Sequence, residues 1–116
     1  MTEDILVKFE NVSKQFQLED GPVEVLKNVN FTIRRGSFTI IYGPSGSGKS
    51  TLLNVLTGLE PPTSGSVVVD GTHLYTLNAD ERAAFRARTT GLVYQTNFWI
   101  NSLSALENVA LPLYLT

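Results

Sequence analysis

Residues 43–51, with the sequence GPSGSGKST, combine the residue types that hold a phosphate chain. They fit the pattern G-x-x-x-x-G-K-[ST] without deviation. Glycine lacks a Cβ atom and tolerates positive φ, so successive backbone N–H groups can approach an anion closely. The Lys49 ammonium can reach the β- and γ-phosphates, and the Ser50 hydroxyl is a hard oxygen ligand of the kind that Mg²⁺ prefers. This stretch therefore predicts a loop that binds nucleotide phosphates together with Mg²⁺.

The predicted phosphate-binding residues form one continuous set in the sequence. They are Gly43, Pro44, Ser45, Gly46, Ser47, Gly48, Lys49, Ser50 and Thr51. A solvent-exposed Gly/Ser linker is the alternative, and composition alone would support it. The flanking sequence favours phosphate binding, because a strand-like segment precedes the loop and an amphipathic helix follows it, with apolar residues at i, i+3, i+4 and i+7. These are Leu52, Val55, Leu56 and Leu59.

Strand patterns surround this loop. Residues 38–42, FTIIY, are almost continuously apolar, which is typical of a central parallel strand buried on both faces. Residues 5–9 and 12–18 predict two strands separated by a turn at residues 10–11, and residues 25–33 alternate as a strand with one solvated face does. A basic pair, Arg34 and Arg35, then predicts a solvated turn at the strand end.

The second half of the chain carries clear local signals. Residues 67–69 predict a strand that ends in a tight hairpin turn at Asp70 and Gly71. Asn78 followed by Glu81, and Ser104 followed by Glu107, are capping-box patterns that each predict the start of a helix. Residues 91–94 predict a further short buried strand.

Composition narrows the class of protein. The chain has 116 residues, of which 42% are hydrophobic and 17% charged, close to the values of an ordinary globular domain. Cysteine is absent, which excludes disulfides and thiolate metal sites. The formal net charge of −2 argues against a nucleic-acid-binding surface, and no apolar run approaches the length of a membrane span. An acidic N-terminus without a signal-peptide pattern predicts a cytoplasmic protein.

The whole run of motifs resembles the N-terminal half of an ATP-binding-cassette (ABC) ATPase domain. The matching segments are FENVSKQF, VLKNVNFTIRRGSF, IYGPSGSGKSTLLNVLTGLEPPTSGSVVVDG, RARTTGLVYQ and LSALENVALPL, in that order. Loop 18–23 and the ALENVALPL segment are most similar to the subfamily that works with lipoprotein-release and macrolide-export permeases. The resemblance implies an α/β fold with a P-loop NTPase-type core. Residues 1–116 are then an incomplete domain, with an antiparallel β subdomain and a partial parallel sheet, that ends where the helical subdomain begins.

The resemblance also implies roles for two residues outside the loop. Phe16 matches the position of an aromatic side chain that stacks on adenine, where the family more often has Tyr; a place in the strand core is the alternative. Gln95 matches the glutamine that ligates Mg²⁺ and senses the γ-phosphate; a polar residue ending a strand is the alternative. Together with Lys49, Gln95 is a candidate catalytic residue, and together with Ser50 it is a candidate metal ligand.

Partners follow from the same resemblance. Phe98, Trp99 and Ile100 are consecutive large apolar residues in the segment after Gln95, where the family receives a helix of the transmembrane permease. Packing of these side chains under the following helix is an equally weighted alternative. The family also implies a second ATPase subunit in a homodimer, and a peripheral location on the cytoplasmic face of the inner membrane.

Several catalytic motifs of the family are not found in these 116 residues. Asp70 follows an apolar run as a Walker B aspartate does, but Gly71 follows it and a hairpin turn explains the pair better. His73 does not match the switch histidine, and no LSGGQ-like signature occurs. We therefore expect weak nucleotide binding without ATP turnover by this chain alone, and marginal stability because strand 38–42 lacks neighbours. The alternatives are a non-catalytic nucleotide-binding fragment and a soluble ABC-type ATPase of DNA repair or translation.

Overall fold

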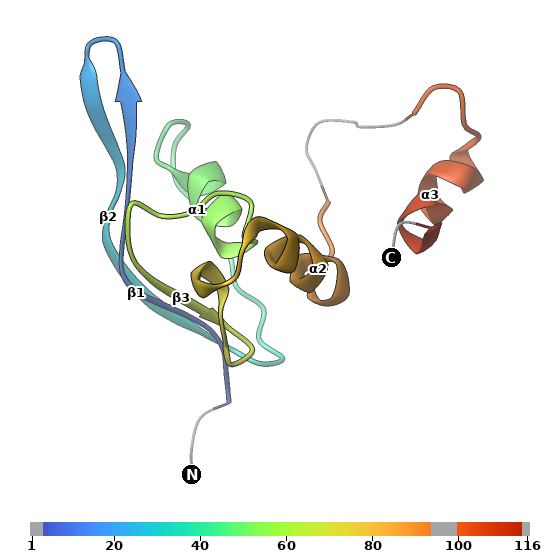
Figure 1. The fold of residues 1–116 in the computed structure, drawn as a ribbon, viewed down its shortest axis with the longest axis horizontal. Coiled ribbons are helices and arrows are strands. Elements are labelled where there is room, and N and C mark those ends of the chain that lie inside the picture. The colour runs from blue at the N-terminus through green and yellow to red at the C-terminus, as the bar shows by residue number, and fades with distance from the viewer. Residues whose placement is uncertain (1–3, 94–99, 115–116) are drawn as a thin grey trace.

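The computed structural model describes residues 4–93 and 100–114, and its centre is one antiparallel sheet. Within these residues the strand order is β2-β1-β3-β4, and α1 lies between the sheet and α2 (Figure 1). No helix in the described ranges has the length and apolar character needed to cross a bilayer. The elements are β1 (Ile5–Leu18), β2 (Gly21–Arg34), α1 (Lys49–Leu56), β3 (Ser64–Val69), β4 (Thr72–His73), the 3₁₀ turn η1 (Leu74–Thr76), α2 (Ala79–Thr89) and α3 (Ala105–Tyr114).

Strand β1 is continuous where the sequence predicted two strands and a turn. Val7 and Phe9 are buried two positions apart, as alternation requires, but Val12 is also buried although it lies an odd number of positions after Phe9. The pairing of β1 with β2 shifts register between Phe9 and Val12, and Asn11 has a φ of 50°. This irregularity has the character of a β-bulge, which returns Val12 to the core face. The prediction of a turn at residues 10–11 is therefore wrong.

The hairpin between β3 and β4 confirms the turn predicted at Asp70 and Gly71. Val69 pairs with Thr72, and the two residues between them have φ angles of 49° and 78°. Two consecutive positive φ angles are the signature of a type I′ turn, which suits the twist of the flanking strands. Arg35, predicted only as part of a solvated turn, forms ion pairs with both Asp70 and Asp4. These carboxylates raise the pKa of Arg35 above its usual value.

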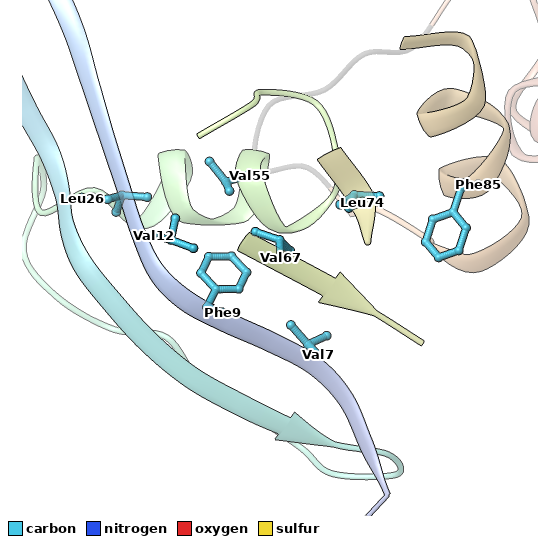
Figure 2. Close-up of a cluster of buried hydrophobic side chains, with 8 residues drawn as sticks. All are labelled: Val7, Phe9, Val12, Leu26, Val55, Val67, Leu74 and Phe85. Atoms are coloured by element: carbon cyan, nitrogen blue, oxygen red, sulfur yellow. The ribbon is translucent and has the colours of Figure 1, made fainter. Parts of the chain in front are cut away.

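The hydrophobic core lies between the sheet and α1 and extends toward α2 (Figure 2). Phe9, Val12 and Val67 of the sheet face Val55, the one fully buried residue of α1 among those described. The buried members are Val7, Phe9, Val12, Leu26, Val55, Val67, Leu74 and Phe85. This cluster fixes α1 on the sheet, because an eight-residue helix has little stability without such packing.

Both predicted capping boxes are present. At the start of α2, the Glu81 N–H donates to the Asn78 side chain at 2.8 Å and the Asn78 N–H donates to the Glu81 carboxylate at 2.9 Å. At the start of α3, the Glu107 N–H donates to the Ser104 hydroxyl at 3.1 Å and the Ser104 N–H donates to the Glu107 carboxylate at 2.9 Å. The Ser104 bonds also hold the pKa of Glu107 below its usual value.

Two predicted strands are not formed. Residues 38–42 have no strand partner in the described part of the chain, and Phe38, Ile40 and Tyr42 are 91%, 69% and 88% exposed. Residues 91–93 are also irregular and exposed, and Tyr94 lies outside the described residues. A parallel strand forms only with a neighbouring strand to which it can hydrogen-bond. None of the strands described here pairs with either segment. Consequently, the described residues form no parallel sheet.

Gly65→Ala tests the close contact between β3 and the β1 bulge. A Cβ atom at position 65 would lie 2.3 Å from the Asn11 carbonyl oxygen, and φ there is 93°. Gly71→Ala is the matched control, since its φ is 78° but a Cβ atom there would meet no other atom within 4 Å. We expect Gly71→Ala to lower the free energy of unfolding by about 1–2 kcal/mol, and Gly65→Ala by roughly 1–3 kcal/mol more. Equal urea-unfolding midpoints for the two variants would contradict this contact.

Candidate functional site

The predicted phosphate loop curls directly into the first turn of α1. Gly46 and Gly48 have φ angles of 82° and 95°, in the region that only glycine adopts readily. The Ser47 N–H donates to the Pro44 carbonyl at 3.2 Å, which closes a tight turn between them. The helix then begins at Lys49, with Gly48 as its N-cap residue. The sequence prediction of a glycine loop followed by a helix is therefore confirmed, although α1 ends at Leu56 and Leu59 of the predicted apolar stripe lies beyond it and is exposed.

The start of α1 offers several backbone donors to a ligand. No side chain caps this end of the helix. The first N–H of α1 that bonds to the preceding turn is that of Leu52, which donates to the Gly48 carbonyl at 2.9 Å. The N–H groups of Lys49, Ser50 and Thr51 precede it and have no acceptor within the helix. Together with the positive end of the helix dipole, they form a setting that favours an anion.

Two glycines allow the loop to pack closely. A Cβ atom on Gly48 would lie 3.1 Å from Val25 Cγ1 and 3.2 Å from the Val25 carbonyl oxygen. A Cβ atom on Gly43 would lie 2.8 Å from Ser47 Oγ. The loop therefore rests on β2 at one end and folds onto itself at the other, and side chains at these positions would open it.

A hollow of about 420 Å³ lies over this loop. The predicted residues that line it are Ser45, Gly46, Gly48, Lys49, Ser50 and Thr51. Gly43, Pro44 and Ser47 instead line a second hollow of about 360 Å³, between the loop and β2. Val25 lines the first hollow and was missed by the sequence analysis. No motif marks Val25, because its place in the site arises only when β2 packs against the loop.

The Lys49 side chain crosses the loop. Its ammonium donates to the carbonyl oxygen of Gly43, at the other end of the motif. The ammonium thus lies inside the curl of the loop, and its charge adds to that of the nearby helix dipole. The Ser50 side chain is exposed and lines the hollow, where its hydroxyl could ligate Mg²⁺ held between it and a phosphate. The donor set fits a magnesium–phosphate group.

None of the other predicted site residues that the structure describes lines either hollow over the loop. Phe16 is half-buried on β1, pairs with Val23 of β2, and has the Lys14 ammonium 5.1 Å from its ring centroid. It lines neither hollow, although Val25 two positions beyond Val23 does. Gln95, Phe98 and Trp99 lie outside the described residues. Ile100 is described and is 42% exposed.

Comparison with known proteins gives matches to one family. The family model described as ABC transporter matches residues 26–114. The macrolide export ATP-binding/permease protein MacB of Brucella abortus is 47% identical over 107 residues, which are 92% of this chain and 17% of MacB. The lipoprotein-releasing system ATP-binding protein LolD of Bordetella avium is 45% identical over 107 residues, which are 92% of this chain and 46% of LolD.

A solved structure shares the fold. The dimeric ATP-binding cassette MJ0796, whose sequence is from Methanocaldococcus jannaschii, was solved in a post-hydrolysis state bound to ADP and Pi. It superposes with a TM-score of 0.89 at 44% identity, over 95% of this chain and 47% of that one. The chain thus spans about half the length of LolD and of this cassette, and a smaller share of MacB.

Lys49→Ala tests the site through the charge at its centre. Loss of one charge-assisted contact to phosphate should raise the Kd for Mg·ATP by about tenfold or more, measured with a fluorescent ATP analogue. Lys27→Ala is the matched control, because Lys27 is an exposed lysine of β2 that lines neither hollow. The site assignment would fail if the two variants bound nucleotide with the same affinity.

Proposed function

This chain belongs to the ABC transporter family, and from that premise we propose that residues 43–51 bind the phosphates of ATP. One observation carries the proposal: Lys49, Ser50 and Thr51, whose N–H groups have no acceptor within α1, line one hollow over the glycine loop, and Lys49 adds a positive charge there. A second, independent support is that the MJ0796 cassette, solved with ADP and Pi, has the same fold over 95% of this chain. The bound nucleotide belongs to that protein and reaches this chain by homology.

The proposal gives separate roles to the loop backbone and to four side chains. Backbone N–H groups of the loop hold the phosphate oxygens, and Lys49 exchanges its contact with Gly43 for the β- and γ-phosphates. Ser50 and Gln95 hold Mg²⁺, which when bound neutralises phosphate charge during transfer to water. Phe16 stacks on adenine, with Lys14 on its ring as a neighbouring cation. Lys49 and Gln95 are the catalytic candidates of the assembled enzyme.

The proposed biological role is to drive a membrane permease. Relatives in this family include an export ATP-binding/permease protein and a lipoprotein-releasing ATP-binding protein, which supports a role in export or lipoprotein release. The permease contact is assigned to the segment after Gln95, where Ile100 is exposed. In this arrangement the ATPase forms a homodimer and sits on the cytoplasmic face of the inner membrane. The dimeric state of MJ0796 supports the first of these points.

We assign residues 1–116 to the N-terminal half of the ABC ATPase domain. The solved cassette is about twice as long as the matched region, which supports this division. Residues 38–42 then become a strand of a parallel sheet when further polypeptide lies beside them. Their exposed apolar side chains, Phe38, Ile40 and Tyr42, are the part of the chain that such a sheet would cover.

Measuring phosphate release as well as Mg·ATP binding distinguishes a nucleotide-binding chain from an active ATPase. A polypeptide of these 116 residues should bind Mg·ATP and release no phosphate above background, because it has no aspartate–glutamate pair after an apolar strand and no signature motif. Phosphate release is measured beside a full-length LolD relative at the same concentration. Comparable turnover by the short polypeptide would contradict the proposal that these 116 residues bind Mg·ATP without hydrolysing it.

Binding of a permease to this chain would distinguish a transporter subunit from the alternative functions. The immobilised chain should retain a detergent-solubilised permease of the lipoprotein-release or macrolide-export type, and serine substitutions at residues 98–100 should reduce the retained amount several-fold. The assay is run with and without Mg·ATP. Retention that is independent of residues 98–100 would contradict the partner segment. Failure to retain any permease, with nucleotide binding intact, would favour a non-catalytic fragment or a soluble ABC-type ATPase.

A further inference from the structure

Both ends of α1 contact the sheet, and the far end has an additional contact with η1. At its start, Gly48 rests on Val25 and Leu26 of β2. At its end, the Tyr75 hydroxyl lies 2.5 Å from the Val55 carbonyl oxygen and 2.8 Å from that of Glu60, and shares its proton between them. Tyr75 belongs to η1, which directly precedes α2 (Figure 1). The helix that presents the phosphate-binding amides is therefore clamped at its far end by a segment outside the motif.

Other contacts reinforce this clamp. The last carbonyls of a helix have no donor within the helix, so donors beyond it can fix their position. The Val55 carbonyl also accepts from the Gly58 N–H at 3.4 Å, a long bond that the Tyr75 hydroxyl supplements. The Arg86 guanidinium of α2 donates to the Thr57 carbonyl at 3.3 Å. Gly58 is buried, and a Cβ atom there would lie 3.6 Å from both Leu74 and Arg86. Tyr75 is thus part of a continuous contact between η1, α2 and the end of α1.

The segment that leads into the loop provides no comparable support. Residues 38–42 form no strand in the described part of the chain, and most of their side chains are exposed. The position of the loop amides therefore depends on α1 and on the contact of Gly48 with β2. An eight-residue helix is a rod of about 12 Å, so a shift at its end is carried to its start.

The Tyr75 hydroxyl is suited to a permanent donor role. The side chain is half-buried, and the Arg82 guanidinium lies 5.2 Å from its ring centroid. Burial raises the pKa of Tyr75 to about 12, so the hydroxyl keeps its proton throughout the physiological range. A donor that stays protonated over this range can hold the two carbonyls in the same place at every physiological pH.

We propose that Tyr75 is a positioning residue for phosphate binding, which it controls by fixing the end of α1. The proposal rests on the proposed nucleotide-binding function of residues 43–51. It does not place Tyr75 in contact with the nucleotide. The structure assigns it instead to the geometry of the backbone N–H groups at the other end of the same helix.

Tyr75→Phe removes the hydroxyl and keeps the ring. Thr76→Val is the matched control, because the adjacent Thr76 hydroxyl donates to the His73 carbonyl at 2.7 Å, within the same turn and away from α1. We expect Tyr75→Phe to raise the Kd for Mg·ATP and for Mg·pyrophosphate by roughly three- to tenfold. Thr76→Val should stay within about twofold of the original chain. Pyrophosphate is included because it reports on the loop without the adenine contact.

Backbone amide chemical shifts of the unliganded chain give a readout that does not depend on nucleotide. Tyr75→Phe should move the shifts of residues 46–51 and speed exchange of the Leu52 N–H, whereas Thr76→Val should leave both unchanged. Unchanged shifts in Tyr75→Phe, or equal loss of affinity in the two variants, would overturn the positioning role. If the original chain bound neither ligand, the proposed function would fail, and the amide shifts would still decide whether Tyr75 positions the N–H groups at the start of α1.

Discussion

The N–H groups at the start of α1 lack acceptors in their own helix, and the architecture around them serves to hold these donors at one place. Such groups attract an anion strongly only when they are prearranged, because ordering them at the moment of binding would reduce the affinity. Glycine at positions 46 and 48 supplies the positive φ angles that aim the loop, and Gly48 allows contact with Val25. The sheet and the η1–α2 segment then fix the helix from opposite sides.

The register shift in β1 also helps to hold α1 in place. Val12 reaches the core beside Val55 of α1 only because β1 shifts register at Asn11. This local distortion is compensated by polar side chains. The Asn11 N–H donates to the Asn30 side chain at 2.9 Å, and the Asn28 N–H donates to the Ser13 hydroxyl at 3.0 Å. Asn11 and Asn28 both have positive φ, which asparagine tolerates better than most residues. The bulge is thus a built feature that helps to place the helix.

The local features were predictable from the sequence, and the non-local ones were not. The glycine loop that leads into a helix, both capping boxes and the Asp70–Gly71 turn each depend on residues within a few positions of one another, and all of them are present. The β1 bulge was predicted as a turn because Asn11 is a turn former. The residues of β2 that pair with β1 and keep it continuous lie far along the chain. The ion pairs of Arg35 with Asp4 and Asp70 were missed for the same reason.

By itself, the sequence determined which donors the glycine loop offers, because the order of glycines, lysine and serine sets the groups that could face a phosphate in the proposed site. It also indicated that residues 38–42 are apolar enough for burial, but apolarity does not specify a partner, and in the described residues this segment is exposed and unpaired. Only the tertiary structure decided that Val25 borders the hollow and that Tyr75 holds the far end of α1. These contacts join residues about twenty or more positions apart in the sequence, and such proximity comes from packing, which no short pattern of residues encodes.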